Sequence, residues 1–414
     1  MKRRTRAAIR ALSAACAGLA LAGYVAQAAG QTVTITPQKG DDFRAVYAGA
    51  ADIAEGKDVA EASCAVCHGL EGRSATPGIP HIAGQRAAYV YVELNAYKVG
   101  RRTNEAMARA VKFLSDDALV KVAAYYSSLE PASPAPLRGA AAAAARGSTL
   151  KVAEAATENC AGCHGEHGVS TTAGMPNLVG QDPKYLAAAI SAYKTGQRKD
   201  DTMKSLVESL DASEIRTIAL YYALQKPARA QTPAKGDRGA GKTAAAACIG
   251  CHGEQGISGN PATPSLAGQD AEYFMSTLHA YKSGARGDAA MSGIAQGLDD
   301  LTMKNLAAYY AALQPRSPAN VRAPLSPAQW VQRCDRCHGV DGNSTDPRVP
   351  ALAAQRFDYL EQVLRAYQTG ARKSAAMAAM TAVLNQVDVK ALAAHYASQR
   401  AHRVVYVTLP CRCQ

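Results

Sequence analysis

The sequence has few aromatic side chains other than tyrosine and no long apolar run. Of its 414 residues one is Trp and four are Phe, whereas 19 are Tyr. No apolar stretch approaches the roughly 20 residues that a helix needs to cross a bilayer, so we expect no membrane-spanning helix. The two-residue periodicity of a strand is weak everywhere except at residues 404–409, which argues against a β fold.

The first 28 residues have the pattern of a secretion signal. Five basic residues within the first ten precede a short apolar stretch at about 11–22, and Ala26-Gln27-Ala28 offers the small residues of a cleavage site. We therefore expect export, with cleavage after Ala28 and a periplasmic location. An uncleaved anchor is disfavoured because the apolar stretch is short. A lipoprotein at Cys16 is disfavoured because Ser13 stands where an apolar residue is required.

The eleven cysteines fall into three groups. Cys16 belongs to the leader, Cys411 and Cys413 lie near the C-terminus, and the other eight form four CxxC pairs. The terminal two could form a disulfide, cross-link two chains or do neither. In an exported protein a CxxC pair could be a disulfide, half of a zinc site or a haem anchor, and the residue that follows the pair distinguishes these.

One unit is repeated four times. Its motifs are CAVCHG, CAGCHG, CIGCHG and CDRCHG, ending at Gly69, Gly165, Gly253 and Gly339. Counted from each motif His, identical residues recur with no insertion or deletion. They are Pro at +12, Gln at +17, Tyr at +29, Gly at +32, Arg at +34 and Met at +39. A register kept four times predicts four copies of one small domain.

Proline-rich segments separate the repeats. Residues 131–147 are rich in Pro and then Ala, 226–236 carry Pro and Lys, and 314–327 hold four prolines. We expect these to be linkers, semi-rigid where proline is dense. The predicted parts are the signal (1–28), domains at 50–130, 147–226, 236–314 and 326–400, and a C-terminal tail (401–414).

Each repeat is predicted to be helical. A short Ala-rich segment precedes each CxxCH, and an apolar stripe predicts a second helix over about 86–98 in the first repeat. A third helix is expected to begin at +47, where all four repeats carry a good N-cap residue. These residues are Ser115, Asp211, Asp299 and Asn385. Asp211 with Glu214 has the spacing of a capping box.

The C-x-x-C-H run is the attachment motif of c-type haem. Its two thiols lie one helical turn apart, where both can add to the vinyl groups of one haem, and the His that follows can reach the iron. The predicted covalent attachment residues are Cys64, Cys67, Cys160, Cys163, Cys248, Cys251, Cys334 and Cys337. The predicted first axial ligands are His68, His164, His252 and His338.

The sixth iron ligand is predicted to be the methionine at +39. Met107, Met203, Met291 and Met377 are the only methionines present at one offset in every repeat. A thioether favours ferrous iron and raises the potential. In the fourth repeat Met380 lies three residues away and could compete. The Tyr at +29 and the Arg at +34, such as Tyr97 and Arg102, could bind a haem propionate or serve only in packing and at the surface.

The pattern CxxCHG, P-x-L-x-G-Q, Y-K-x-G-x-R, Met and a capped helix resembles class I cytochrome c. It is most similar to the cytochrome c4 group, whose members carry two such domains, and the resemblance covers about 320 residues. It implies an all-α fold around each haem. It also implies that the carbonyls of Pro80, Pro176, Pro264 and Pro350 hold the Nδ1 protons of the axial histidines. The fourth repeat departs from the pattern at Ala354 and Gln368, where the others have Gly and Lys.

The charge does not indicate a nucleic-acid partner. The formal charge of +12 includes the five basic residues of the leader, and the propionates of four haems would bring the mature protein close to neutrality. We expect a periplasmic tetrahaem electron carrier rather than an enzyme. By resemblance its donor is a quinol-oxidising complex or a dehydrogenase, and its acceptor a terminal oxidase or reductase, with any membrane association through those partners.

Two alternatives stay open from the sequence. A multihaem peroxidase or reductase would need one haem with an exchangeable sixth site and nearby acid–base groups. The fourth repeat, with Met377, Met380 and His395, is where such a site would be sought. The chain could also be the cytochrome subunit of a dehydrogenase complex.

Overall fold

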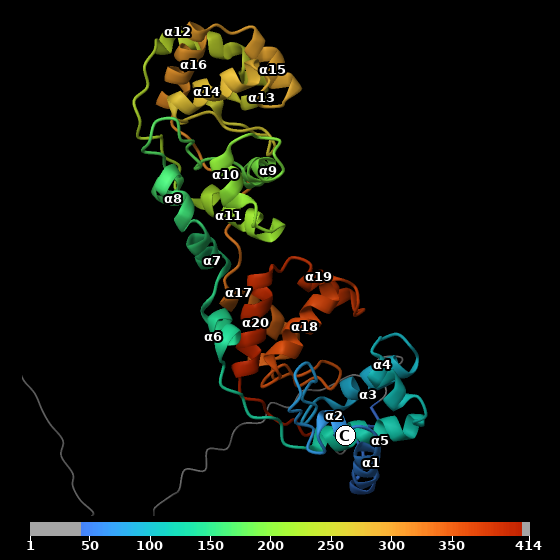
Figure 1. Cartoon of the computed structure of the whole chain (residues 1–414). Coiled ribbons are helices and arrows are strands. Elements are labelled where there is room, and N and C mark those ends of the chain that lie inside the picture. The colour runs from blue at the N-terminus through green and yellow to red at the C-terminus, as the bar shows by residue number, and fades with distance from the viewer. Residues whose placement is uncertain (1–42, 408–414) are drawn as a thin grey trace, which may run out of the picture. The chain divides into compact units, whose positions relative to one another are not determined.

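A computed structural model of the chain describes residues 43–407 (Figure 1). The predicted cleavage site at Ala28, the cysteines at 16, 411 and 413, and residues 408–409 lie outside this range. Residues 404–407 form no strand, although the two-residue periodicity of the sequence extends over 404–409. Within 43–407 the only β contact is an isolated bridge between Arg198 and Arg286. The fold class is all-α, as predicted.

The first repeat contains five helices, and the second contains the same set with a 3-10 turn after the CxxCH helix. The first set is α1 (Ala50–Ser63), α2 (Ala65–His68), α3 (Ala87–Lys98), α4 (Glu105–Val111) and α5 (Asp116–Ser128). The second set is α7 (Thr149–Ala156), α8 (Glu158–His164), η1 (Glu166–Gly168), α9 (Pro183–Lys194), α10 (Asp201–Val207) and α11 (Ala212–Leu224).

The third and fourth repeats are built in the same way. The third comprises α12 (Arg238–Ala244), η2 (Ala245–Ala247), α13 (Ile249–His252), η3 (Glu254–Gly256), α14 (Ala271–Lys282), α15 (Ala289–Gln296) and α16 (Asp300–Ala312). The fourth comprises α17 (Pro327–His338), η4 (Val340–Gly342), α18 (Phe357–Gln368), α19 (Ala375–Thr381) and α20 (Gln386–Ser398).

The last helix of each repeat begins where the sequence predicts. Ser115, Asp299 and Asn385 each accept a hydrogen bond from the backbone N–H three residues on. Asp211 and Glu214 form a capping box. A cap satisfies backbone donors that the helix leaves free, and each contributes about 1 kcal/mol. The +47 prediction is therefore confirmed in all four repeats.

The first and last helices of a repeat pack against each other, as α12 and α16 do (Figure 1). In the first and third repeats this packing is close at a glycine. A Cβ on Gly56 of α1 would lie 2.1 Å from the carbonyl oxygen of Lys121, and one on Gly241 of α12 would lie 2.1 Å from that of Asn305. These two crossings require a residue without a side chain in the helix that leads into the CxxCH segment.

The first linker is not entirely extended. Residues 139–146 form helix α6 (Gly139–Arg146), which packs against α20 of the fourth repeat (Figure 1). The run of alanines explains this, because alanine has the highest helix propensity. The expected semi-rigid character concerns the proline-bearing residues before α6 and stays a prediction.

Contacts between repeats do not follow the order of the chain. Gln85 and Arg86 of the first repeat hydrogen-bond to the fourth, and Gln181 of the second hydrogen-bonds to the third. The first and fourth repeats thus form one pair and the second and third another. Among the helices within residues 43–407, none is long and apolar enough to cross a membrane.

Candidate haem-binding sites

Each motif histidine is buried and held at one ring nitrogen. His68, His164, His252 and His338 are between 6% and 9% exposed. Their Nδ1 atoms lie 2.8 to 3.1 Å from a proline carbonyl oxygen 12 residues later. The pairs are His68 with Pro80, His164 with Pro176, His252 with Pro264 and His338 with Pro350. A carbonyl can only accept, so Nδ1 carries the proton and Nε2 is left as the free lone pair.

Burial favours the neutral form of three of these imidazoles. It lowers the pKa of His68, His164 and His338, against the smaller opposing effect of the proline carbonyl. A neutral imidazole with a fixed tautomer is the form that binds a metal.

The first cysteine of each motif does not have the lowered pKa of a reactive thiol. The first of each pair is half-buried and the second exposed, and none is in a disulfide. Burial raises the pKa of Cys64 and of Cys334 to about 11, and it raises the pKa of Cys160 and Cys248 as well. Reactive or redox-active cysteines have lowered pKa values instead. The first thiol of each pair thus lacks the lowered pKa of a redox-active cysteine, and the second is accessible for covalent attachment.

A cavity in the first repeat joins the motif to the +39 methionine. It is lined by Cys64, Cys67 and His68 on one side and by Met107 on another, with apolar walls from Leu94, Val111 and Val122. Two sulfur anchors, an imidazole and a thioether around an apolar space are the donor set that a c-type haem needs. The residues present therefore fit the group.

The +39 methionines all sit at the same place on a short helix. Met107, Met203, Met291 and Met377 are each the third residue of their helix and each half-buried. The backbone N–H of each methionine donates to the side-chain oxygen of the N-cap residue at +36. These N-cap residues are Asn104, Asp200, Asp288 and Ser374. Met380 is 38% exposed and has no such anchor. The N-cap at +36 was visible in the sequence but not used in the prediction.

The Tyr and Arg of the Y-K-x-G-x-R segment stack on each other. The guanidinium carbons of Arg102, Arg286 and Arg372 lie 4.5 to 5.0 Å from the ring centres of the Tyr five residues earlier. The same arginines reach the partner repeat, where Arg372 donates to the Tyr89 hydroxyl at 2.8 Å and Arg102 to that of Tyr359 at 3.3 Å. A tyrosine at +21 in all four repeats was the missed signal for this contact.

The two departures of the fourth repeat are accommodated. Lys98, Lys194 and Lys282 each donate to the carbonyl 16 residues later, and Gln368 donates to the equivalent carbonyl of Leu384 at 2.8 Å. Ala354 adopts a φ of 53°, in the left-handed region that glycine occupies in the other repeats. It borders a small pocket with Ala401 and His402, which leaves room for its methyl group.

Two family models match the chain. The model described as Cytochrome c matches residues 53–130 and 144–221, and the one described as Cytochrome C oxidase, cbb3-type, subunit III matches 234–309 and 327–395. Cytochrome c4 of Pseudomonas aeruginosa is 34% identical over 42% of this chain and 88% of its own length. The chain belongs to the class I cytochrome c family. It is a cytochrome c4-like, multihaem member, and its four CxxCH motifs carry four covalent c-type haems.

The chain is also similar to a second group of curated proteins and to a solved structure. A protein of Stutzerimonas stutzeri (strain A1501) named thiosulfate dehydrogenase electron acceptor is 31% identical over 41% of this chain and 81% of its own length. The solved cytochrome c4 of Acidithiobacillus ferrooxidans is 30% identical, with 38% of this chain and 99% of that one covered and a TM-score of 0.36. By its two curated relatives, this cytochrome is an electron-transfer protein related to both groups.

Proposed function

We propose that this cytochrome is a periplasmic carrier with four six-coordinate His/Met haems, one in each of the domains 50–130, 147–226, 236–314 and 326–400. Each haem supplies a one-electron iron centre. The proposed axial pairs are the motif histidine and the +39 methionine of the same repeat. The observation that carries this proposal is the cavity that His68 and Met107 share with Cys64 and Cys67.

The protein's own part is to hold the ligands and exclude water. The proline carbonyl fixes the imidazole tautomer, and the N-cap at +36 fixes the start of the methionine helix. Apolar walls around the site keep the local dielectric low, and the thioether favours the ferrous state. Filled coordination leaves no position for a substrate, which supports a carrier over an enzyme.

Partner choice is part of the same proposal. We expect a quinol-oxidising complex or a dehydrogenase as the donor and a terminal oxidase or reductase as the acceptor. The relative named thiosulfate dehydrogenase electron acceptor favours a dehydrogenase as the donor, either as a separate protein or as a complex that includes this cytochrome. If the dehydrogenase copurifies with this cytochrome at fixed stoichiometry, the two form a stable complex. If it reduces the purified cytochrome without binding it stably, the cytochrome is a separate carrier.

The ligand assignment is tested by Met107→Ala. The variant should keep four covalent haems, while the potential of one falls on the order of 0.1 V, within the roughly 0.8 V range that axial ligands span. Redox titration followed by visible spectroscopy measures this. An unchanged titration would show that Met107 is not a ligand.

The fourth repeat offers a matched pair of variants. Met377→Ala should lower one potential, while Met380→Ala should leave all four unchanged, because only Met377 is capped by Ser374 and half-buried. The reverse outcome would assign Met380. A five-coordinate, high-spin haem in the unmodified protein would instead favour the peroxidase or reductase alternative.

A further inference from the structure

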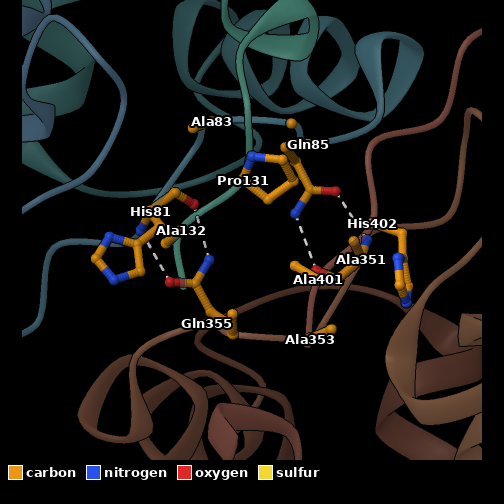
Figure 2. A pocket seen from close by; sticks show the side chains of 12 residues that line it. His81, Ala83, Gln85, Pro131, Ala132, Ala351, Ala353, Gln355, Ala401 and His402 are labelled. Atoms are coloured by element: carbon orange, nitrogen blue, oxygen red, sulfur yellow. Dashed lines mark hydrogen bonds between the residues drawn. The ribbon is translucent and has the colours of Figure 1, made fainter. Parts of the chain in front are cut away.

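One peptide group in each repeat is hydrogen-bonded on both sides. In the first repeat the Pro80 carbonyl accepts from His68 Nδ1 at 3.1 Å, and the N–H of the same peptide group belongs to His81. That N–H donates to Oε1 of Gln355 at 2.8 Å (Figure 2). A side chain of the fourth repeat therefore bonds to the peptide group that holds the motif histidine of the first.

The fourth repeat receives the same contact in return. The Pro350 carbonyl accepts from His338 Nδ1 at 3.0 Å, and the N–H of Ala351 donates to Oε1 of Gln85 at 2.8 Å (Figure 2). Each glutamine also donates through Nε2 to the carbonyl of the residue it faces, at 2.9 Å for Gln85 and 2.8 Å for Gln355. Both ends of each side-chain amide are thus used.

The second and third repeats form an equivalent pair. The N–H of Asn177 donates to Oε1 of Gln269 at 2.6 Å, and that of Ser265 donates to Oε1 of Gln181 at 3.0 Å. Return bonds run from Gln269 Nε2 to the Asn177 carbonyl and from Gln181 Nε2 to the Ser265 carbonyl. The +17 glutamine and the +13 backbone are therefore joined in four places, always between repeats.

These contacts are shielded from water. The four glutamines are between 4% and 9% exposed. Hydrogen bonds in series polarise one another when they lie in a medium of low dielectric. The series here runs from the glutamine Oε1 through the peptide group to the Nδ1 proton of the histidine in the partner repeat.

We propose that each +17 glutamine is a positioning residue for the motif histidine of the repeat it faces, so that the haems are coupled as first with fourth and second with third. The proposal rests on the proposed function in one respect, that these histidines are axial ligands. An acceptor on the peptide N–H makes its carbonyl a stronger acceptor, which strengthens the bond from Nδ1. The imidazole becomes a stronger donor and favours the ferric state.

The contact is tested first without reference to the iron. In the full-length holoprotein, Gln355→Ala should speed hydrogen exchange at the His81 amide about fivefold, since a net hydrogen bond of ordinary strength is lost. Gln181→Ala is the matched control and should speed exchange at Ser265 and leave His81 unchanged. If Gln181→Ala rather than Gln355→Ala affects His81, the pairing is wrong.

The second test is the redox potential. Gln355→Ala should raise the potential of the haem in the first repeat, with roughly a twofold to fivefold change in its ferrous-to-ferric ratio at fixed potential. Gln355→Glu, with a stronger acceptor, should lower it. That haem is identified as the one whose potential or paramagnetic NMR signals respond to Met107→Ala.

The outcomes separate the two proposals. Faster exchange at His81 with unchanged potentials would keep the pairing and overturn the tuning role. A shift confined to the haem of the fourth repeat would show that Gln355 acts within its own domain and overturn the proposal. If Met107→Ala changes no potential while Gln355→Ala does, the assignment of Met107 as a ligand is wrong and the role of the glutamine stands. If Gln355→Ala does not fold, Gln85→Ala tests the reciprocal contact at Ala351.

Discussion

At the scale of single residues, the recurring positions have different physical reasons. In the first repeat the motif His and the +39 Met line one cavity, and the +12 Pro holds the His through its carbonyl, as their register suggested. The +17 Gln recurs equally but acts between repeats. Its targets at +13 are His81, Asn177, Ser265 and Ala351, which share no side-chain type because only their backbone is bonded. A contact to backbone leaves no pattern in the sequence, so this role could not be predicted.

Gly268 is a residue whose replacement should be costly. It has a φ of +71°, and an added Cβ would lie 2.8 Å from the Pro315 ring. We expect Gly268→Ala to destabilise the protein by about 2 kcal/mol or more, from the left-handed backbone and the clash together. The midpoint of guanidinium unfolding measures this.

Ala354→Gly is the natural comparison. Relief of strain at its φ of 53° is offset by the lost methyl burial and by the greater freedom of glycine in the unfolded chain. The change should therefore be close to neutral. A similar loss of stability in both variants would contradict the explanation from the Pro315 contact.

His81 should make the first and fourth repeats sensitive to acid. Burial lowers its pKa, as do the charges of Arg356 and Arg73, while Asp358 opposes them. Among the described residues its buried Nδ1 has no hydrogen-bond partner. Below the ordinary His pKa of about 6.5 the unfolded state binds more protons than the folded one. Stability should thus fall as the pH drops through that value, by at most about 1.4 kcal/mol per pH unit.

The measurement is an unfolding series between about pH 5 and 8, the range in which histidine titrates. His81→Asn should flatten the acid side, because Asn is the residue at the same place in the second repeat and keeps the backbone contact. A pH dependence equal in both proteins would show that other groups are responsible.

At the scale of elements, the helices were predictable where local signals are strong. The +47 caps and the helix over 87–98 follow from side chains within a few residues. The short methionine helices, such as α10 with seven residues, have too little periodicity to be recognised. The N-cap residue at +36 is the local signal that marks where each of these helices begins. Helix α6 was not predicted, because the prolines at 131, 134 and 136 make the same segment resemble an extended linker.

Removing one of these caps should loosen the methionine helix. In Asp200→Ala the N–H of Met203 loses its acceptor at 2.8 Å, so we expect about 1 kcal/mol of lost stability. Release of the proposed Met203 ligand should then begin at a lower temperature, followed by the loss of the Met–iron absorption band. Thr202→Ala, at an exposed position on the same helix, should leave that temperature unchanged.

At the scale of the whole molecule, the two pairs differ in charge. Between the first and fourth repeats, Glu93 bridges Arg102 at 2.6 Å and Arg372 at 3.0 Å, and its side chain is 22% exposed. The equivalent arginines of the second and third repeats, Arg198 and Arg286, instead contact the hydroxyl of Tyr185. The half-buried Glu93 makes the arginine cluster of the first pair less positive than that of the second. A less positive surrounding favours ferric iron, so the first pair should have the lower potentials.

Glu93→Gln tests this difference. Loss of the carboxylate should raise a potential in the first or fourth repeat by an amount on the order of 1 kcal/mol per electron, with smaller effects on the other pair. Redox titration measures it, with Glu55→Gln as a control. Glu55 is an exposed residue of α1 paired with Lys121, and its removal should shift no potential. Equal shifts in all four haems would contradict a local effect.

The pairing of the first repeat with the fourth also orders the folding of the chain. The second and third repeats are adjacent in sequence, so they can meet as soon as both have been synthesised. The first repeat must wait for residues about 270 positions later, the separation of Gln85 from Ala351. Its binding face, with His81 and Gln85, therefore stays open until the last domain emerges, and this closure is the slow, long-range step.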